Sequence, residues 1–196
     1  MSTFFVAFLP LFIAIDAIGI LPTFLNMTAG NDQKERRKIV KNATVTALLI
    51  GVTFVFVGKY LFQFLGISMS DFKVAGGSLL FLFAIKDLTF SEGERKGTND
   101  PHVGIVPIGM PLIAGPGVLT SMLLLVPTQG EALVVSAYLV NILIVFTVFW
   151  FSNHIIKLMG EAAAMAIGKL FAIFLGAIGV MMIRSGVTEY ITNYVG

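Results

Sequence analysis

Two features of this chain place residues that can do chemistry in strongly apolar surroundings. One is the lone acid Asp16, which lies inside an apolar segment at about residues 3–25. The other is the tripeptide Gly115-Pro116-Gly117, which interrupts residues 103–130, a run of 28 residues without Asp, Glu, Lys or Arg. A buried charge needs a partner, a cavity or a proton, and a helix break at membrane depth needs protein or a polar cavity around its freed backbone groups. Both features therefore indicate a functional site.

The composition indicates a membrane protein. Of the 196 residues, 57% are hydrophobic and 12% are charged, and the mean hydropathy is +0.92. A membrane-spanning helix needs about 20 mostly apolar residues. Six segments qualify, at roughly residues 3–25, 42–64, 72–90, 103–126, 132–153 and 162–190. The sequence therefore predicts an all-α fold with six transmembrane helices in a lipid bilayer.

Basic residues gather in the connection expected after the first segment, at residues 26–41. They are Lys34, Arg36, Arg37, Lys38 and Lys41. Because cytoplasmic loops of membrane proteins carry an excess of Lys and Arg, we expect this connection in the cytoplasm and both termini outside. Topology explains these charges more simply than nucleic-acid or lipid-specific binding does, and we expect no nucleic-acid partner.

A shift of 98 positions relates the two halves of the chain. It aligns residues 14–25 with residues 112–123 and gives four identities, namely Ile15/Ile113, Gly19/Gly117, Leu21/Leu119 and Leu25/Leu123. We expect one transmembrane domain over residues 1–196, with repeat A at about 1–90, a linker at about 91–102 and repeat B at about 103–196. A unit of three crossings must be inserted upside down in its second copy, which gives the 3+3 inverted repeat common among secondary transporters. Helices 1 and 4 would then both be broken near the midplane.

Asp16 is too deep to reach the membrane surface. If the first helix begins at Thr3, Asp16 lies ~20 Å along a hydrocarbon core of ~30 Å. It is a candidate to contact a substrate amine or to carry a coupling proton, and the alternative is that it caps the second half of a broken helix. Gly19 and Pro22 predict a milder break there than in helix 4.

The Gly-Pro-Gly break in helix 4 predicts an anion site. Pro116 has no N–H and prevents helical continuation, while Gly115 and Gly117 adopt backbone angles that other residues avoid. A helix that restarts near Gly117 leaves its first N–H groups unpaired, with the hydroxyls of Thr120 and Ser121 one turn further on. Such a terminus attracts a carboxylate. The alternative is a simple proline kink.

Other small and polar residues in the predicted spans have a structural and a functional interpretation. Gly76, Gly77 and Ser78 favour close helix packing, although backbone exposed beside a cavity is the alternative. Asn141 favours an interhelical hydrogen bond, with substrate contact as the alternative. Packing alone is expected of four further glycines, namely Gly51, Gly58, Gly176 and Gly179.

Enzymatic chemistry is not expected. No second acid lies deep in a predicted span, so the carboxylate pair of an intramembrane aspartyl protease is missing. His102 and His154 have no metal-ligand spacing, and the chain has no cysteine. Gly168-Lys169 does not belong to a Walker A motif, because Leu170 follows it and the upstream glycine is missing. We therefore expect no cofactor and no metal.

Three motifs give the chain a resemblance to a known family. They are Ile15-Asp16-Ala17-Ile18-Gly19-Ile20-Leu21-Pro22, Val74-Ala75-Gly76-Gly77-Ser78-Leu79-Leu80-Phe81 and Pro111-Leu112-Ile113-Ala114-Gly115-Pro116-Gly117. The combination resembles the MarC family of inner-membrane proteins, which is related to the LysE-type amino-acid exporters. The departure is Ala17, where the family usually has proline, so the break in helix 1 is expected to be softer.

The resemblance implies six helices, external termini and movement of neutral amino acids such as glycine and alanine. Carried onto this sequence, it implies a substrate site made of Asp16, Gly19, Pro22, Gly115, Pro116, Gly117, Thr120 and Ser121. The coupling ion stays open: Asp16 is a candidate to exchange a proton, and sodium is less favoured because the sequence has no convincing group of oxygen ligands. A homo-oligomer is also left open. The alternatives are a scaffold or sensor that transports nothing, and a passive channel for small solutes.

Overall fold

The computed structural model describes residues 3–89 and 104–194, which are helical throughout apart from short turns. Within these ranges no strand occurs. The elements are α1 (Thr3–Ile15), α2 (Leu21–Met27), α3 (Gln33–Leu65), α4 (Met69–Thr89), the π-helical segment η1 (Gly104–Ile113), α5 (Pro116–Gln129), α6 (Glu131–Trp150), α7 (Ser152–Met159) and α8 (Glu161–Tyr194). The linker predicted at about 91–102 lies outside the described residues.

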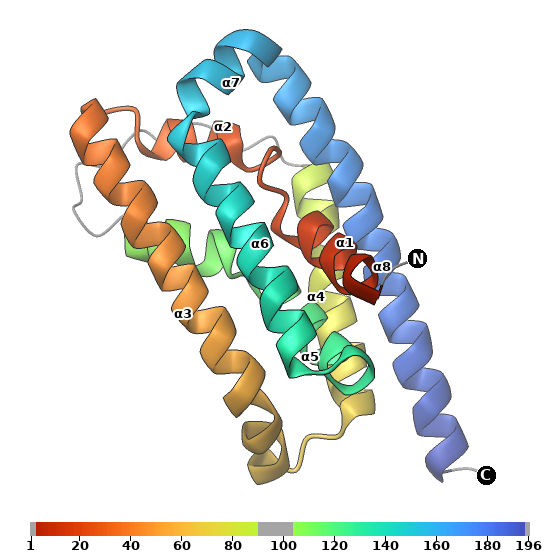
Figure 1. The fold of residues 1–196 in the computed structure, drawn as a ribbon. Helices are drawn as coiled ribbons and strands as arrows, with labels where there is room; N and C mark the ends of the chain where they lie inside the picture. Colours follow the sequence, from red (N-terminus) through yellow and green to blue (C-terminus); the bar gives the residue numbers. More distant parts are fainter. Residues whose placement is uncertain (1–2, 90–103, 195–196) are drawn as a thin grey trace.

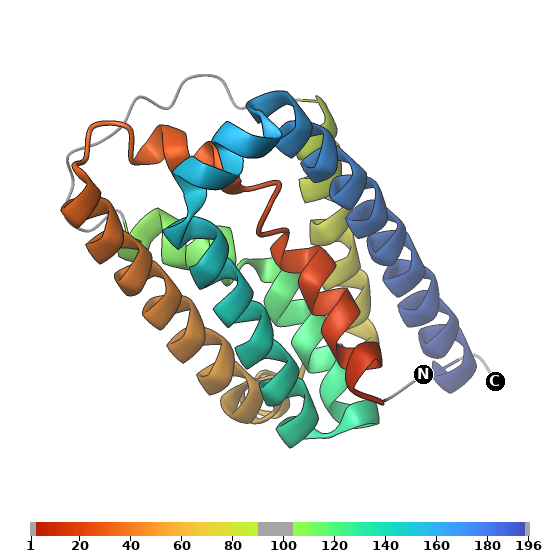
Figure 2. The ribbon, with the colours of Figure 1, turned by 45° about the horizontal axis from the view of Figure 1, so that its top comes forward.

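The helices pack side by side, with α3 and α8 as the longest elements and α4 and α6 next in length (Figure 1). The start of α3 lies at the same end as α2 and α7, and α5 lies toward the opposite end (Figure 1). Figure 2 shows α1 (red) alongside α5 (green), two elements that are in contact. By length and apolar composition, three described helical stretches can cross a membrane: Gln33–Gly58, Glu131–Trp150 and Met165–Thr192. The shorter stretches Thr3–Ile15 and Gly117–Gln129 are also apolar.

Two of the predicted spans are each divided in the structure. The span expected at residues 3–25 consists of α1 and α2, and the span expected at residues 103–126 consists of η1 and part of α5. Within η1, Val106 (φ −130°, ψ 125°) and Met110 (φ −140°, ψ 128°) have extended backbone, because each precedes a proline that disfavours the helical conformation.

The start of α3 differs from the prediction. The span was expected to begin at residue 42, yet α3 begins at Gln33, so its basic residues are helical. A capping box explains the early start: the Asp32 carboxylate accepts the Glu35 N–H at 2.7 Å, and the Glu35 carboxylate accepts the Asp32 N–H at 3.1 Å. Lys and Arg are also good helix formers, so their charge does not end the helix.

Glycines allow the closest helix contacts, as the sequence predicts. A Cβ built on Gly77 in α4 would lie 2.6 Å from the Gly179 carbonyl oxygen in α8, so the two backbones touch. Gly51 packs against the Tyr138 ring, and the Tyr138 hydroxyl donates to the Ala47 carbonyl oxygen at 2.7 Å. Packing contacts are likewise confirmed for Gly58, which meets Leu123, and for Gly176, which meets Ala84. An ion pair between Lys73 and Glu189 further joins α4 to α8.

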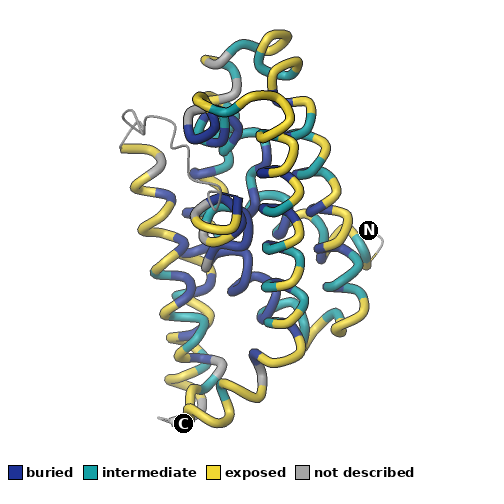
Figure 3. The backbone as a smooth tube through the Cα atoms, turned by 90° about the vertical axis from the view of Figure 1, so that its left-hand side faces the viewer, coloured by how far each residue is buried: buried dark blue, intermediate teal, exposed yellow. Residues whose placement is uncertain are grey.

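The exterior of the helices is apolar. Exposed large hydrophobic residues run along α3, α4 and α8, including Phe64, which is 87% exposed, while buried residues lie between the elements (Figure 3). Inside, Phe24 of α2 stacks on Phe149 of α6 with ring centroids 4.2 Å apart. An exterior of this kind is stable in hydrocarbon and costly in water.

Candidate functional site

Asp16 forms a turn that interrupts the helical backbone after α1. Its φ is +48°, a left-handed conformation that Asp tolerates better than most residues. The Asp16 carboxylate accepts the Gly19 N–H at 2.9 Å, and the Asp16 carbonyl oxygen accepts the Ile20 N–H at 3.0 Å. Residues 16–20 are therefore an ordered turn that directs the chain into α2, where Pro22 is buried in the first turn.

This turn rests on the backbone of α8. A Cβ built on Gly19 would lie 2.0 Å from Oδ2 of Asp16 and 2.5 Å from the Cα of Gly168. In the opposite direction, a Cβ on Gly168 would lie 2.8 Å from the Cα of Gly19. Neither position has room for a side chain, so the Asp16 turn packs directly against the backbone of α8.

The start of α5 is a buried helix N-terminus. Gly115 is its N-cap with φ −74° and ψ 167°, and no side chain makes a capping hydrogen bond there. The N–H groups of Val118 and Leu119 both donate to the Gly115 carbonyl oxygen, at 3.0 and 3.1 Å. Pro116 has no N–H, and Gly117 N–H has by its position no acceptor within the helix. The sequence predicts several unpaired N–H groups at this terminus. In the structure the N–H groups of Val118 and Leu119 are paired, and the one left for a ligand is that of Gly117.

Side chains from α4 cover this terminus. A Cβ on Gly117 would lie 2.4 Å from Cδ2 of Leu80, so the Leu80 side chain sits directly over it. One turn further on, Thr120 is buried against Gly76, where a Cβ would lie 2.4 Å from Cγ2 of Thr120. Ser121 is also buried, and its hydroxyl donates to the Gly117 carbonyl oxygen at 2.8 Å.

The other small and polar residues considered from the sequence, Gly76, Gly77, Ser78 and Asn141, make packing contacts or hydrogen bonds. Gly77 faces α8, and the Ser78 hydroxyl donates within α4 to the Val74 carbonyl oxygen at 2.8 Å. The predicted interhelical hydrogen bond of Asn141 is confirmed, since its amide donates to the Phe8 carbonyl oxygen in α1 at 3.3 Å. The structure thus brings Gly76 to Thr120 and packs α1 against α5, whereas the turn after Asp16 rests on α8.

Residues 1–191 match the sequence model of the MarC family integral membrane proteins. The chain belongs to the MarC family. Its relatives include the UPF0056 membrane protein of Archaeoglobus fulgidus, which is 29% identical with 98% of this chain and 96% of the relative covered. A UPF0056 membrane protein of Buchnera aphidicola subsp. Schizaphis graminum is 30% identical, and the match covers 93% of this chain and 95% of the relative. No solved structure matches the chain.

Membership of the MarC family agrees with the apolar exterior and makes this an integral membrane protein. Two residues that shape the candidate site were not predicted for it, namely Gly168 and Leu80. Gly168 lies eight positions before Gly176, and that spacing of small residues along one helix was the available signal for a packing face. For Leu80 the sequence has no such signal, because its role depends on how α4 packs against α5.

Proposed function

We propose that this protein is a secondary transporter of small neutral amino acids of the glycine and alanine class. The substrate site would lie between the Asp16 turn and the start of α5. The observation that supports this most is that two apolar segments are interrupted, one at a carboxylate and the other at a helix N-terminus without a side-chain cap. An amino-acid zwitterion complements both, since its ammonium group pairs with Asp16 and its carboxylate with the Gly117 N–H and the positive end of α5.

The spacing of the elements supports a 3+3 inverted repeat with six spans. α1 and η1 end at Ile15 and Ile113, which are 98 positions apart, and α3 and α6 begin at Gln33 and Glu131, also 98 apart. Two elements also pack against their counterparts in the repeat, α3 against α6 and α4 against α8. Such pairing is expected around a pseudo-two-fold axis in the membrane plane, with both interruptions near the midplane.

Leu80 would give the proposed site a closed state. The Leu80 side chain packs against Gly117, and in this proposal a substrate carboxylate would reach the Gly117 N–H after Leu80 changes rotamer or α4 moves away from α5. Alternating access requires a step of this kind, in which the site opens to one side at a time. The nearby contact between Gly76 and Thr120 lies on the same α4–α5 interface.

We further propose that protons drive transport and that the protein lies in the inner membrane. Asp16 would exchange the coupling proton, because a carboxylate deep in a membrane segment is easily neutralised, and no enzymatic step is involved. We place the protein in the inner membrane with both termini outside, so that the basic start of α3 faces the cytoplasm. The chain has no cysteine, so single introduced cysteines report this orientation without background labelling.

Flux measurements in proteoliposomes test the transport proposal. We expect saturable glycine or alanine flux for the wild type, driven by an imposed pH gradient. Asp16→Asn should raise KM by about 10- to 100-fold, as expected for the loss of one charge-assisted contact, and should make the remaining flux independent of the pH gradient. Asp71→Asn is the matched control, because it removes one carboxylate at an exposed site outside the proposed pocket.

A second variant tests the α5 terminus. Gly117→Leu forces Leu80 and the start of α5 apart at the proposed carboxylate contact and should abolish flux, while gel filtration checks that the protein stays folded. Undiminished flux in both Asp16→Asn and Gly117→Leu would refute the site. Absence of flux in the wild type would favour the scaffold or sensor, and flux that does not saturate would favour the channel.

A further inference from the structure

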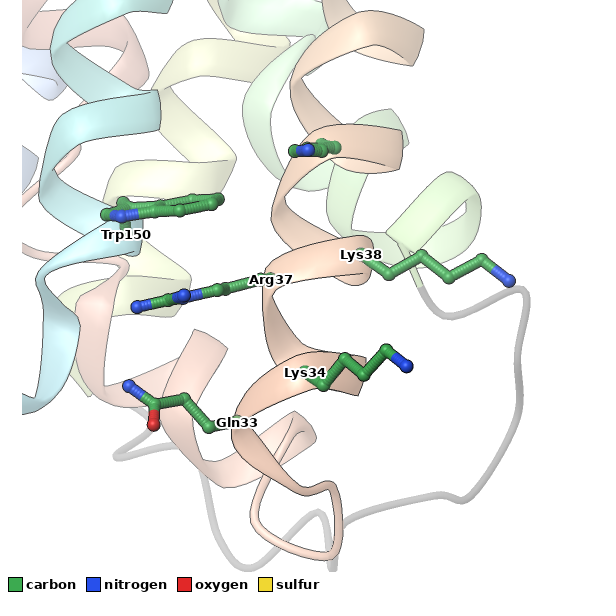
Figure 4. Close-up of a pocket in the computed structure, with 6 residues that line it drawn as sticks. Gln33, Lys34, Arg37, Lys38 and Trp150 are labelled. Atoms are coloured by element: carbon green, nitrogen blue, oxygen red, sulfur yellow. The ribbon is translucent and has the colours of Figure 1, made fainter.

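A basic groove lies at the start of α3, apart from the proposed transport site. It has a volume of about 500 Å³ and is lined by Gln33, Lys34, Arg37, Lys38, Lys41 and Trp150. Gln33 and Arg37 extend toward Trp150 on α6, while Lys34 and Lys38 extend away from it (Figure 4). The lining of the groove includes four cations and no acid.

The four cations occupy one face of α3. Lys34, Arg37, Lys38 and Lys41 have the spacing i, i+3, i+4 and i+7, at which like charges repel each other on a helix. Their neighbours Asp32 and Glu35 are engaged in the capping box. Among the described residues, the ion pair that the structure contains joins Lys73 to Glu189, so none of the four is paired with a described carboxylate. The positive charge of the groove therefore favours an anion from outside the described chain.

Trp150 indicates where this groove lies relative to the bilayer. It is the last residue of the candidate span Glu131–Trp150, and the candidate span Gln33–Gly58 begins beside it. Trp side chains concentrate at the boundary between hydrocarbon and headgroups. Cζ of Arg37 lies 4.8 Å from the centre of the Trp150 ring, and Nζ of Lys41 lies 5.9 Å from it. Arg37 and Lys41 are therefore held at the depth expected of lipid phosphates.

The adjacent arginine has a different role. Arg36 donates to Oδ1 of Asn153 in α7 at 2.8 Å and to the Thr28 carbonyl oxygen after α2 at 3.1 Å. It therefore joins the start of α3 to two neighbouring elements and keeps the groove in place. Positive-inside topology needs only charges on one side of the membrane, and it requires neither a single helix face nor a cation stacked on Trp150.

We propose that this groove binds the phosphate of an anionic membrane phospholipid. Arg37 and Lys41 contact the phosphate beside the Trp150 ring, and Lys34 and Lys38 add positive charge at the same end of α3. A free phosphate ion has the same chemistry but no acyl chains, so the experiment separates the two sources. The proposal does not depend on transport, because binding is measured without flux.

Trp150 is the only tryptophan, so its fluorescence reports on this groove directly. The full-length protein is reconstituted in vesicles that contain equal fractions of brominated phosphatidylglycerol or brominated phosphatidylcholine, whose bromine atoms quench nearby tryptophan. We expect stronger quenching by phosphatidylglycerol in the wild type. In Arg37→Gln/Lys41→Gln, the preference should fall by about fivefold or more.

Two further variants control for fluorophore environment and for charge. Lys34→Gln/Lys38→Gln leaves the contacts of Trp150 unchanged and should also reduce the preference. Lys157→Gln/Lys169→Gln removes the same number of exposed cations elsewhere and should retain it. Each groove variant keeps three of the five basic residues at positions 34–41, and single-cysteine labelling confirms that its orientation is unchanged.

The outcomes separate lipid binding from its alternatives. Equal quenching of the wild type by both lipids would overturn the proposal, as would an equal loss of preference in the Lys157/Lys169 control. Inorganic phosphate is titrated in vesicles of phosphatidylcholine alone. A saturable response of Trp150 to phosphate, together with equal quenching by the two lipids, would overturn the lipid assignment and favour a free phosphate compound.

Discussion

Gly168→Ala tests whether α8 supports the Asp16 turn. The added Cβ would lie 2.8 Å from the Cα of Gly19, a backbone atom that cannot rotate away. To reach a normal carbon–carbon separation, the turn or α8 must move by about 0.7 Å. Overpacking of this kind costs about 1–3 kcal/mol. The helix itself gains roughly 0.5–1 kcal/mol from replacing glycine by alanine, which offsets part of that cost.

Gly176→Ala is the matched control on the same helix. Its Cβ would meet only the Cβ of Ala84, at 3.2 Å, so a small adjustment accommodates it while the gain in helix propensity is the same. The Gly168 variant should therefore be less stable than the Gly176 variant by about 1–3 kcal/mol. Because Gly19 also donates to the Asp16 carboxylate, the Gly168 variant should in addition show reduced amino-acid flux.

Unfolding in mixed micelles by increasing amounts of a denaturing detergent gives the free energy of unfolding of each variant. Circular dichroism follows the loss of helix, and the wild type is measured in the same lipid and detergent. Equal stability of the two variants, or a more stable Gly168→Ala, would show that Gly19 and Gly168 are not in contact and would refute this account of the turn.

Two further substitutions test individual contacts. Asn141→Leu removes the hydrogen bond to the Phe8 carbonyl oxygen and should lower the free energy of unfolding by about 0.5–1 kcal/mol in the same detergent titration, whereas an unchanged value would argue against this contact between α1 and α6. Two hydrogen bonds from the preceding turn hold the pKa of Asp71 below its ordinary value of 3.8. Its contribution to stability is therefore complete above pH 3.8 and is lost as the pH falls through the lower pKa of the folded state. Thermal unfolding as a function of pH should show a smaller acid-induced loss for Asp71→Asn than for the wild type, and equal losses would contradict this assignment.

The all-helical fold could be predicted from the sequence because hydropathy determines it. A bilayer has no water to satisfy backbone groups, and apolar segments of about 20 residues match the length of a spanning helix. The early start of α3 was missed although its signal was present. Asp32 and Glu35 have capping-box spacing, but the basic residues that follow were interpreted as a connection.

The contacts that surround the candidate site could not be predicted from the sequence. Asp16 and the break before α5 were recognisable from residue types alone. The contacts of Gly19 with Gly168 and of Gly117 with Leu80 join segments far apart in the chain, and they depend on the angles at which helices cross. The same holds for Arg37 on Trp150, which lie on α3 and α6.

Binding of an amino acid to the purified protein tests the central claim most directly. The claim is that a small zwitterion is held between Asp16 and the start of α5. The wild type, Asp16→Asn and Asp71→Asn are unfolded thermally with and without glycine or alanine. A ligand at 100 times its dissociation constant stabilises the folded state by ~2.7 kcal/mol. We expect this stabilisation in the wild type and in Asp71→Asn, and its loss in Asp16→Asn. Equal stabilisation of all three proteins, or none in the wild type, would contradict the claim.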